Sequence, residues 1–261
     1  MNVKLYQVDA FTGQVFGGNP AGVCPLIHDW LDDRLMQNIA MENNLAETAF
    51  YIEKNGQYSI RWFTPKVEVD LCGHATLATA HVMFHHEGYK SNGIVFESRS
   101  GKLFVRKEGE YITLNFPTDE IRKIDMEESM VDCFGTKPHQ IYKGKTDYLF
   151  VYKSENEIQD MRFDLDKIAK LDARGAIITA PGKDVDFVSR FFAPQSGVNE
   201  DPVTGSAHTT LVPYWREVLG KDSLTAMQLS KRKGELKCKY LKDRVEISGK
   251  AKTYLSGEII L

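Results

Sequence analysis

The sequence lacks several features that mark specialised classes of protein. It has only four cysteines in 261 residues, and no two of them are spaced as C-x-x-C, which argues against a zinc site or a disulfide framework. No apolar run approaches the roughly 18 residues that a membrane helix needs. The opening residues lack the basic and apolar regions of a secretory signal. We therefore expect a cytoplasmic protein without a membrane partner.

An excess of charge of one sign is also missing. Lysine and arginine total 33 against 36 aspartate and glutamate residues, and both signs are spread along the chain. A nucleic-acid partner is therefore not expected. Hydrophobic residues make up 42% of the chain, as in a soluble globular protein. The length suits two domains of roughly 100–150 residues each.

The sequence contains an internal repeat, in which the same series of motifs occurs twice. RWFTP at residues 61–65 returns as RFFAP at 190–194, and LCGHA at 71–75 returns as VTGSA at 203–207. Three weaker matches occur in the same order: 46–52 with 173–179, 101–105 with 234–238, and 111–116 with 245–250. Two related halves that differ by small loop insertions would produce this pattern.

Each half predicts strands around an apolar helix. The expected helices cover residues 31–41 and 75–85 in the first half, and 164–171 and 207–219 in the second. Pro213 should kink the last helix or mark its true start. An apolar helix inside a curl of strands gives an α+β fold with two pseudo-symmetric lobes, each a curved sheet or barrel around a central helix.

The boundary between the lobes is predicted where a proline precedes a charged run. Residues 116–130 have this composition and should form the linker. The N-terminal lobe would then be residues 1–116, joined by a returning C-terminal strand at 252–261. The C-terminal lobe would be residues 117–251.

The repeated glycine turns indicate an anion site. Gly73 and Gly205 each stand where a turn enters a helix, and a helix N-terminus offers free backbone N–H groups and a partial positive charge. If the lobes face each other, both turns would orient one small carboxylate substrate. Its α-carbon could then lose a proton without a cofactor. The expected substrate-binding residues are those of the two turns: Cys72, Gly73, Ala75, Thr204 and Gly205.

Proton transfer also needs an acid and a base. Glu47, whose match in the second half is Arg174, is the candidate base, and His74, Asp201 and Ser206 lie in or beside the turns. Plainer roles compete, because a lone glutamate is usually solvated and a serine at this position is usually an N-cap. His81 and His85 have a spacing that metal sites use, but no third ligand is nearby, so no metal is expected.

Four segments together resemble the PhzF family: VDAFTGQVFGGNPAGV, NLAETAF, RWFTPKVEVDLCGHATLATAH and GVNEDPVTGSAH. The resemblance covers essentially the whole chain and implies the two-lobed diaminopimelate epimerase fold. It implies a cofactor-independent isomerase like the enzyme that acts on trans-2,3-dihydro-3-hydroxyanthranilate in phenazine biosynthesis, commonly a homodimer. Glu47 would be the acid/base, assisted by His74, Asp201 and Ser206, while backbone groups of Gly73 and Gly205 would hold the substrate carboxylate.

Two other functions stay open. Related epimerases and racemases place a cysteine before each glycine turn, whereas this chain has Cys72 in the first half and Thr204 in the second. Threonine is a poor acid or base near neutral pH, which counts against a two-cysteine mechanism. An amino-acid racemase using Cys72 with another partner is one alternative. A ligand-binding or protein-binding chain that kept the fold without catalysis is the other.

Overall fold

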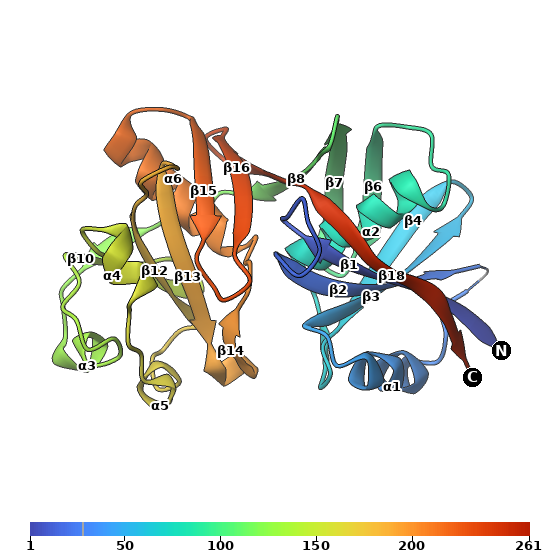
Figure 1. Ribbon diagram of the computed structural model, residues 1–261, viewed down its shortest axis with the longest axis horizontal. Helices are drawn as coiled ribbons and strands as arrows, with labels where there is room; N and C mark the ends of the chain where they lie inside the picture. The colour runs from blue at the N-terminus through green and yellow to red at the C-terminus, as the bar shows by residue number, and fades with distance from the viewer. Residues whose placement is uncertain (28) are drawn as a thin grey trace. The chain divides into compact units, whose positions relative to one another are not determined.

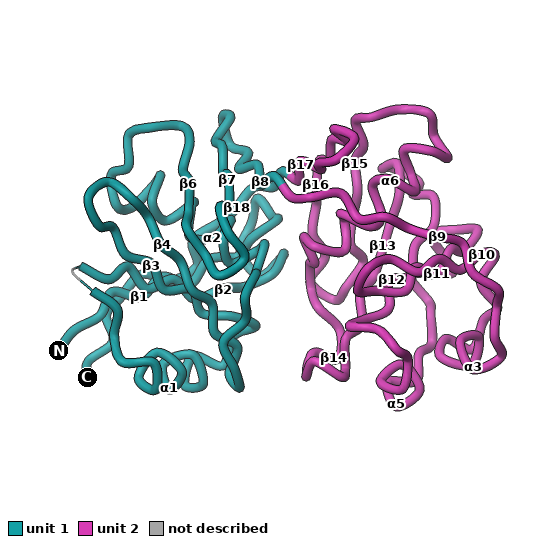
Figure 2. Tube along the Cα trace, turned by 180° about the vertical axis from the view of Figure 1, so that it is seen from behind, with its two compact units in different colours: residues 1–115, 248–261 teal, residues 116–247 magenta. Residues whose placement is uncertain are grey.

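The structure, a computed structural model, describes residues 1–27 and 29–261. These residues form two compact units, which Figure 2 distinguishes by colour: unit 1 consists of residues 1–115 and 248–261, and unit 2 of residues 116–247. The chain therefore leaves unit 1 once and returns to it for the last strand. Among the described residues, no helix is long and apolar enough to cross a membrane.

Unit 1 contains two helices among strands (Figure 1). β1 pairs antiparallel with β2 and β18, β2 runs parallel to β3, β3 antiparallel to β4, and β4 parallel to β6, after which β6, β7 and β8 form an antiparallel meander. The elements are β1 Asn2–Ala10, β2 Asn19–Leu26, α1 Asp33–Asn43, β3 Glu47–Lys54, β4 Gln57–Phe63, β5 Glu68–Val69, α2 Gly73–His85, β6 Gly93–Ser98, β7 Gly101–Glu108, β8 Tyr111–Pro117 and β18 Ala251–Ile260.

Unit 2 repeats this pairing scheme. β11 runs parallel to β12, β12 antiparallel to β13, β13 parallel to β15, and β15 antiparallel to β16. This match confirms the predicted pseudo-symmetry. The elements are β9 Arg122–Ile124, α3 Glu128–Val131, β10 Gln140–Lys143, β11 Asp147–Val151, α4 Glu155–Gln159, α5 Leu165–Ile168, β12 Gly175–Pro181, β13 Phe187–Ala193, the 3₁₀ turn Pro194–Ser196, β14 Val198–Asp201, α6 Ala207–Leu219, β15 Ser223–Gln228, β16 Gly234–Tyr240 and β17 Arg244–Gly249.

The strand registers correct one detail of the sequence repeat. Phe50 on β3 lies opposite Arg61 on β4, and Ile178 on β12 lies opposite Arg190 on β13. Because Arg61 and Arg190 are the matched residues of the repeat, β12 is offset by one residue from the sequence match. A slip of one residue moves every side chain to the other face of a strand. The counterpart of Glu47 in the sheet is therefore the first residue of β12, Gly175, and not Arg174 as predicted.

A buried helix forms the centre of each unit. In α2 the ten residues from His74 to Met83 are all buried, and the helix contacts β1, β2, β3 and β18. The corresponding α6 contacts β11, β15 and β16. A helix that is apolar on every side is stable only when protein surrounds it, as for α2, whereas the last residues of α6, 216–219, are exposed. The predicted helices at 75–85 and 207–219 are thus confirmed within two residues.

Three details of the predicted elements were wrong. Pro213 lies inside a continuous α6. Because proline has no N–H, the carbonyl of Thr209 lacks its partner within the helix, and it accepts a hydrogen bond from the Asp119 N–H at 3.2 Å instead. The proposed linker 116–130 is part of unit 2, where β9 pairs with β10. The predicted helix at 164–171 is only the single turn α5, and α4 precedes it.

The burial of α2 predicts where truncation destabilises the fold. Leu77 is fully buried on α2, so Leu77→Ala should lower the free energy of unfolding by about 2–5 kcal/mol through lost contacts and a cavity. Val218, on α6, is 54% exposed, and Val218→Ala should change stability by less than about 0.5 kcal/mol. Urea unfolding measures both, and equal effects would contradict the placement of α2 at the centre of unit 1.

Candidate active site

The predicted base of unit 1 lies against the histidine of the first glycine turn. Glu47 is the first residue of β3, and His74 is the second residue of α2. The Oε2 atom of Glu47 is 3.1 Å from Nε2 of His74, and the side chains are only 16% and 6% exposed. The pair meets the distance of an ion pair, but the atoms do not align as a hydrogen bond, and neither has another hydrogen-bond partner among the described residues. Catalytic contacts often align in this loose way before substrate binds.

Two further side chains hold the other nitrogen of His74. Nδ1 lies 3.2 Å from Nδ2 of Asn19 and 3.5 Å from Sγ of Cys72. Asn19 is fully buried at the start of β2, which pairs with β3 beside Glu47. These contacts leave Nε2 facing Glu47. In the charged ring Nδ1–H is a donor, and its acceptor is then Sγ of Cys72 rather than the amide nitrogen of Asn19. Sequence reasoning did not single out Asn19, although it lies within one of the segments that carry the family resemblance.

The charges of this cluster follow from burial and from Glu47. Burial, reinforced by the negative charge of Glu47, raises the pKa of Cys72 to about 11, so the thiol is neutral near pH 7. Burial alone would lower the pKa of His74, but the acidic groups of Cys72 and Glu47 outweigh it and hold that pKa well above its usual value.

The two central helices begin without a side-chain cap. The N-cap positions are Cys72 for α2 and Ser206 for α6, and neither side chain caps its helix. Of the other α-helices, α1, α4 and α5 are capped by Asp32, Ser154 and Asp164, whereas the short α3 is not. Backbone N–H groups in the first turn of an uncapped helix remain available to an anion.

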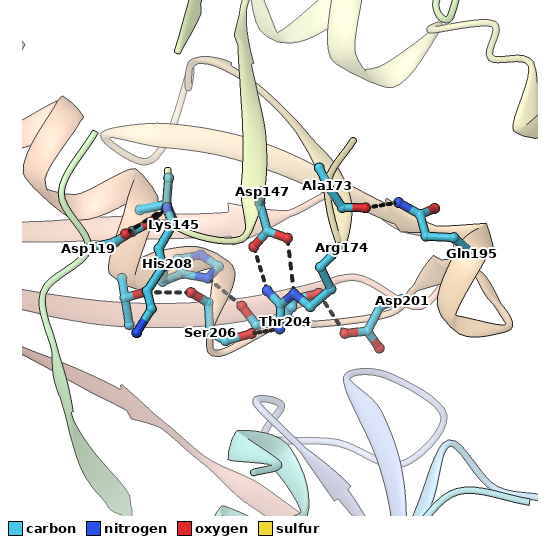
Figure 3. A network of polar contacts seen from close by, with 12 residues as sticks. Asp119, Lys145, Asp147, Ala173, Arg174, Gln195, Asp201, Thr204, Ser206 and His208 are labelled. Atoms are coloured by element: carbon cyan, nitrogen blue, oxygen red, sulfur yellow. Dashed lines mark hydrogen bonds and ion pairs between the residues drawn. The ribbon is translucent and has the colours of Figure 1, made fainter. Parts of the chain in front are cut away.

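The second turn, in unit 2, is held by a network of hydrogen bonds (Figure 3). The Thr204 hydroxyl donates to Oδ2 of Asp201 at 2.6 Å, and Gln228 donates to the backbone carbonyl of Asp201 at 2.8 Å. Oε1 of Gln228 also accepts from the Thr204 N–H at 2.9 Å, and its side chain is fully buried. The turn is thereby anchored to β15. Nothing in the sequence pattern indicated this role for Gln228.

An arginine reaches the same turn from the start of β12. Nη1 of Arg174 donates to Oγ of Ser206 at 3.0 Å, while Nε and Nη2 donate to the carboxylate of Asp147 at 3.0 and 2.5 Å (Figure 3). Gly175, in the register position of Glu47, has no room for a side chain, because an added Cβ would lie 2.5 Å from the Phe191 ring. Unit 2 therefore has no acid at this position.

His208, two residues after the second turn, is neither exposed nor charged. It lies on α6 with its ring fully buried, and Nδ1 is 2.8 Å from the carbonyl oxygen of Thr204. Burial lowers its pKa to about 4, so the ring is neutral near pH 7. A neutral Nδ1–H that donates to Thr204 supports the turn from inside unit 2.

The predicted site residues form two groups, one in each unit. Unit 1 brings together Glu47 with the consecutive turn residues Cys72, Gly73, His74 and Ala75, while unit 2 brings together Asp201, Thr204, Gly205 and Ser206. Within each unit, the residues lie at the start of the central helix. Their roles in binding or catalysis stay predictions.

Unit 1 also contains three groups that could hold a metal ion. One donor atom each from Glu47, Cys72 and His74 lies within 4.8 Å of the others. Metal binding needs a thiolate and a neutral imidazole. The raised pKa values of Cys72 and His74 keep a proton on both groups near pH 7, so this set suits proton transfer better than ligation. His81, spaced from His85 as in metal sites, instead contacts the hydroxyl of Thr253 through Nε2 at 2.9 Å.

Comparison with known proteins supports the same fold and family. A family model described as phenazine biosynthesis-like protein, PhzC-PhzF, matches residues 8–257. A Pseudomonas aeruginosa protein named as an uncharacterized isomerase is 48% identical, with all of both chains covered. The crystal structure of a PhzF family protein from Enterococcus faecalis has a TM-score of 0.97 at 45% identity, again over both whole chains. A hydroxyproline epimerase from Agrobacterium vitis, 9% identical, shares the fold with a TM-score of 0.62 over 99% of this chain and 92% of its own.

The pair of Glu47 and His74 predicts a coupled titration. In Glu47→Gln the pKa of His74 should fall, because the ring loses the neighbouring carboxylate that helps to raise it. A raised pKa in the folded state also means that the pair stabilises the wild type most fully below about pH 6.5, while Glu47 is ionised. This stabilisation is lost as the pH rises through the folded pKa of His74. NMR titration of the ring measures the shift.

His208 is the internal control for that titration. It is equally buried, but its contact is a backbone carbonyl rather than Glu47, so its pKa of about 4 should be the same in both proteins. A His74 pKa that does not move in Glu47→Gln would show that the carboxylate does not set the charge of the ring.

Proposed function

This chain belongs to the PhzC-PhzF family of phenazine biosynthesis-like proteins, and on that basis we propose that it is an isomerase in which Glu47 carries a proton between two carbons of a small carboxylated substrate. Relatives that match over the whole chain are named as isomerases, which supports this reaction class. The substrate is cyclic or amino-acid-like, and the reaction needs no cofactor.

The contact between Glu47 and His74 is the observation that carries this proposal. A carboxylate beside an imidazolium can accept a proton from carbon. The transfer turns Glu47 into a neutral carboxylic acid and leaves the imidazolium as a cation, so no buried negative charge is added. The same carboxyl group then returns the proton to another carbon. Its low exposure, 16%, limits exchange of that proton with water during the transfer. His74 orients Glu47, and the carboxylate regains its ionised form when it gives the proton to the second carbon.

The uncapped helix starts supply the other half of the mechanism. Removing a proton next to a carboxylate builds negative charge on the substrate, and the N–H groups of Gly73 and Gly205 would stabilise such charge. Asp201 and Ser206 would position the substrate from unit 2. Asp201 accepts the Thr204 hydroxyl at 2.6 Å, which directs its carboxylate toward that turn.

A racemase that uses Cys72 is less favoured by these groups. Cys72 is 6% exposed, and its pKa of about 11 leaves very little thiolate near pH 7. Its counterpart Thr204 donates its hydroxyl to Asp201 and is a poor proton donor to carbon. A binding protein without catalysis would have no physical need for a largely buried glutamate beside a charged histidine. The homodimer and the cytoplasmic location stay predictions, which light scattering and cell fractionation would test.

The proton shuttle predicts the effect of Glu47→Gln. The amide has nearly the same shape but no basic oxygen, so the rate should fall by about 10²–10⁴-fold. Entry of deuterium from heavy water next to the carboxylate, followed by NMR, measures the rate on trans-2,3-dihydro-3-hydroxyanthranilate and a panel of amino and hydroxy acids. Glu42→Gln, at an exposed position on α1, is the matched control and should keep the wild-type rate.

Cys72→Ser separates the two enzyme mechanisms in the same assay. The variant should retain exchange if Glu47 is the base. Loss of exchange in Cys72→Ser together with full exchange in Glu47→Gln would move the chain to the cysteine racemases. If the wild type binds compounds of the panel but catalyses deuterium exchange in none of them, the result would favour a binding protein without catalysis.

A further inference from the structure

The segment that leads into each glycine turn is attached to the preceding strand by an arginine. In unit 1, Nε and Nη2 of Arg61 on β4 donate to the two carboxylate oxygens of Glu68 on β5, at 2.7 and 2.8 Å. In unit 2, Nε and Nη2 of Arg190 on β13 donate to the two carboxylate oxygens of Glu200 on β14, at 2.7 and 3.1 Å. The arginines are matched residues of the repeat, and each glutamate stands five residues before the glycine of its turn. We refer to each arginine with its glutamate as a clamp.

Each arginine is also held between two aromatic rings, in the same arrangement. One ring belongs to the residue two positions further along the strand, and the other comes from the segment shortly before a helix. The guanidinium carbon lies between 5.1 and 5.4 Å from the ring centres: Arg61 from Trp30 and Phe63, and Arg190 from Phe163 and Phe192. The side chains of Arg61 and Arg190 are only 15% and 10% exposed. A stacked guanidinium with two parallel hydrogen bonds is fixed in one orientation.

The strand registers show which residues the clamps place. Val69 on β5 lies opposite Trp62, and Asp201 on β14 lies opposite Phe191. Because these two partners are matched residues of the repeat, Val69 and Asp201 occupy equivalent positions, each directly after the glutamate of its clamp. In unit 2 this position carries the carboxylate that accepts the Thr204 hydroxyl at 2.6 Å. The clamp on the preceding residue therefore fixes the backbone that carries Asp201.

Backbone pairing alone holds these segments over a short length. β5 and β14 each pair with the preceding strand at only two positions. A charge-assisted hydrogen bond is roughly twice as strong as one between neutral groups, and each clamp contains two of them side by side. The clamps therefore contribute much of the attachment of both segments.

We propose that Arg61 and Arg190 are positioning residues, each of which sets the place of its own glycine turn through the glutamate that it holds. The clamp of unit 1 positions the turn that carries His74. The clamp of unit 2 positions Asp201 and the turn that follows it. The effect on the reaction rests on the proposed function, whereas the place of each turn can be measured without a substrate.

One histidine reports on each turn. His74 lies in the first turn and contacts Glu47 at 3.1 Å, and Nδ1 of His208 lies 2.8 Å from a backbone carbonyl of the second turn. Glu68→Gln keeps the shape of the side chain and removes its charge. It should lower the pKa of His74, because the contact with Glu47 loosens, and leave the NMR signals of His208 in place. Glu200→Gln should shift the Nδ1 signal of His208 and leave the pKa of His74 unchanged.

The same two variants should slow the reaction. A displaced turn misplaces the groups that hold the substrate, so deuterium exchange should fall by about 10–100-fold in Glu68→Gln and in Glu200→Gln. Asp33→Asn is the matched control. Asp33 contacts Arg61 at 2.8 Å, but it lies on α1 and is 73% exposed. Its substitution should change neither the exchange rate nor the signals of either histidine.

Removal of one partner from a largely buried ion pair also destabilises a protein, so a second variant separates position from stability. Arg190→Met with Glu200→Gln removes both charges and leaves an apolar side chain between Phe163 and Phe192. This double variant should melt near the wild-type temperature, shift the signal of His208 and lose exchange as Glu200→Gln does. A double variant that keeps the wild-type signals and exchange rate would overturn the proposal.

Failure of the clamps and failure of the proton shuttle give different results. If Glu47→Gln exchanges deuterium normally while Glu68→Gln and Glu200→Gln each shift the histidine of their own turn, the shuttle is wrong and the clamps stand. If the clamp variants lose exchange with both histidine signals unchanged, the arginines do not act through the turns and the proposal fails. It fails also if each single variant changes both histidines alike, because the effect is then on the whole fold.

Discussion

A helix whose first turn is buried has its free backbone N–H groups inside the protein, and this constraint shapes both candidate turns. α2 and α6 lie among the strands of their units, and neither has a side-chain cap. Their first turns must therefore take partners from the neighbouring strands or from a ligand. The residues that arrive there, Glu47 with His74 and Arg174 with Ser206, come from the start of the adjacent strand in each unit.

The two units share one scheme of strand pairing but carry different side chains at the glycine turn. In unit 1 a carboxylate faces a histidine, and its charge keeps the ring protonated, which suits the transfer of a proton. In unit 2 the register position of that acid is Gly175, and the acid nearest to it, Asp147, is buried and neutralised by Arg174.

Much of the fold was predictable because the repeat is visible in strong local patterns. Two features identified equivalent positions in the halves: the motif of arginine, aromatic residues and proline, and the glycine turn before an apolar helix. The candidate residues Glu47, His74, Asp201 and Ser206 followed from the family segments. Asn19 and Gln228 were not predictable, since their contacts depend on which strands become neighbours. The match of Arg174 to Glu47 was off by one residue, because a comparison of letters contains no information on which face of a strand a side chain takes.

The fate of the transferred hydrogen tests the role of Glu47 most directly. Substrate deuterated at the carbon that loses the proton is converted in ordinary water, and the product of a single turnover is analysed by mass spectrometry. If one carboxyl group with little exposure removes and returns the proton, we expect a measurable share of the deuterium to reach the accepting carbon. Product that carries hydrogen from water alone at that carbon would contradict the shuttle and would favour separate acid and base groups.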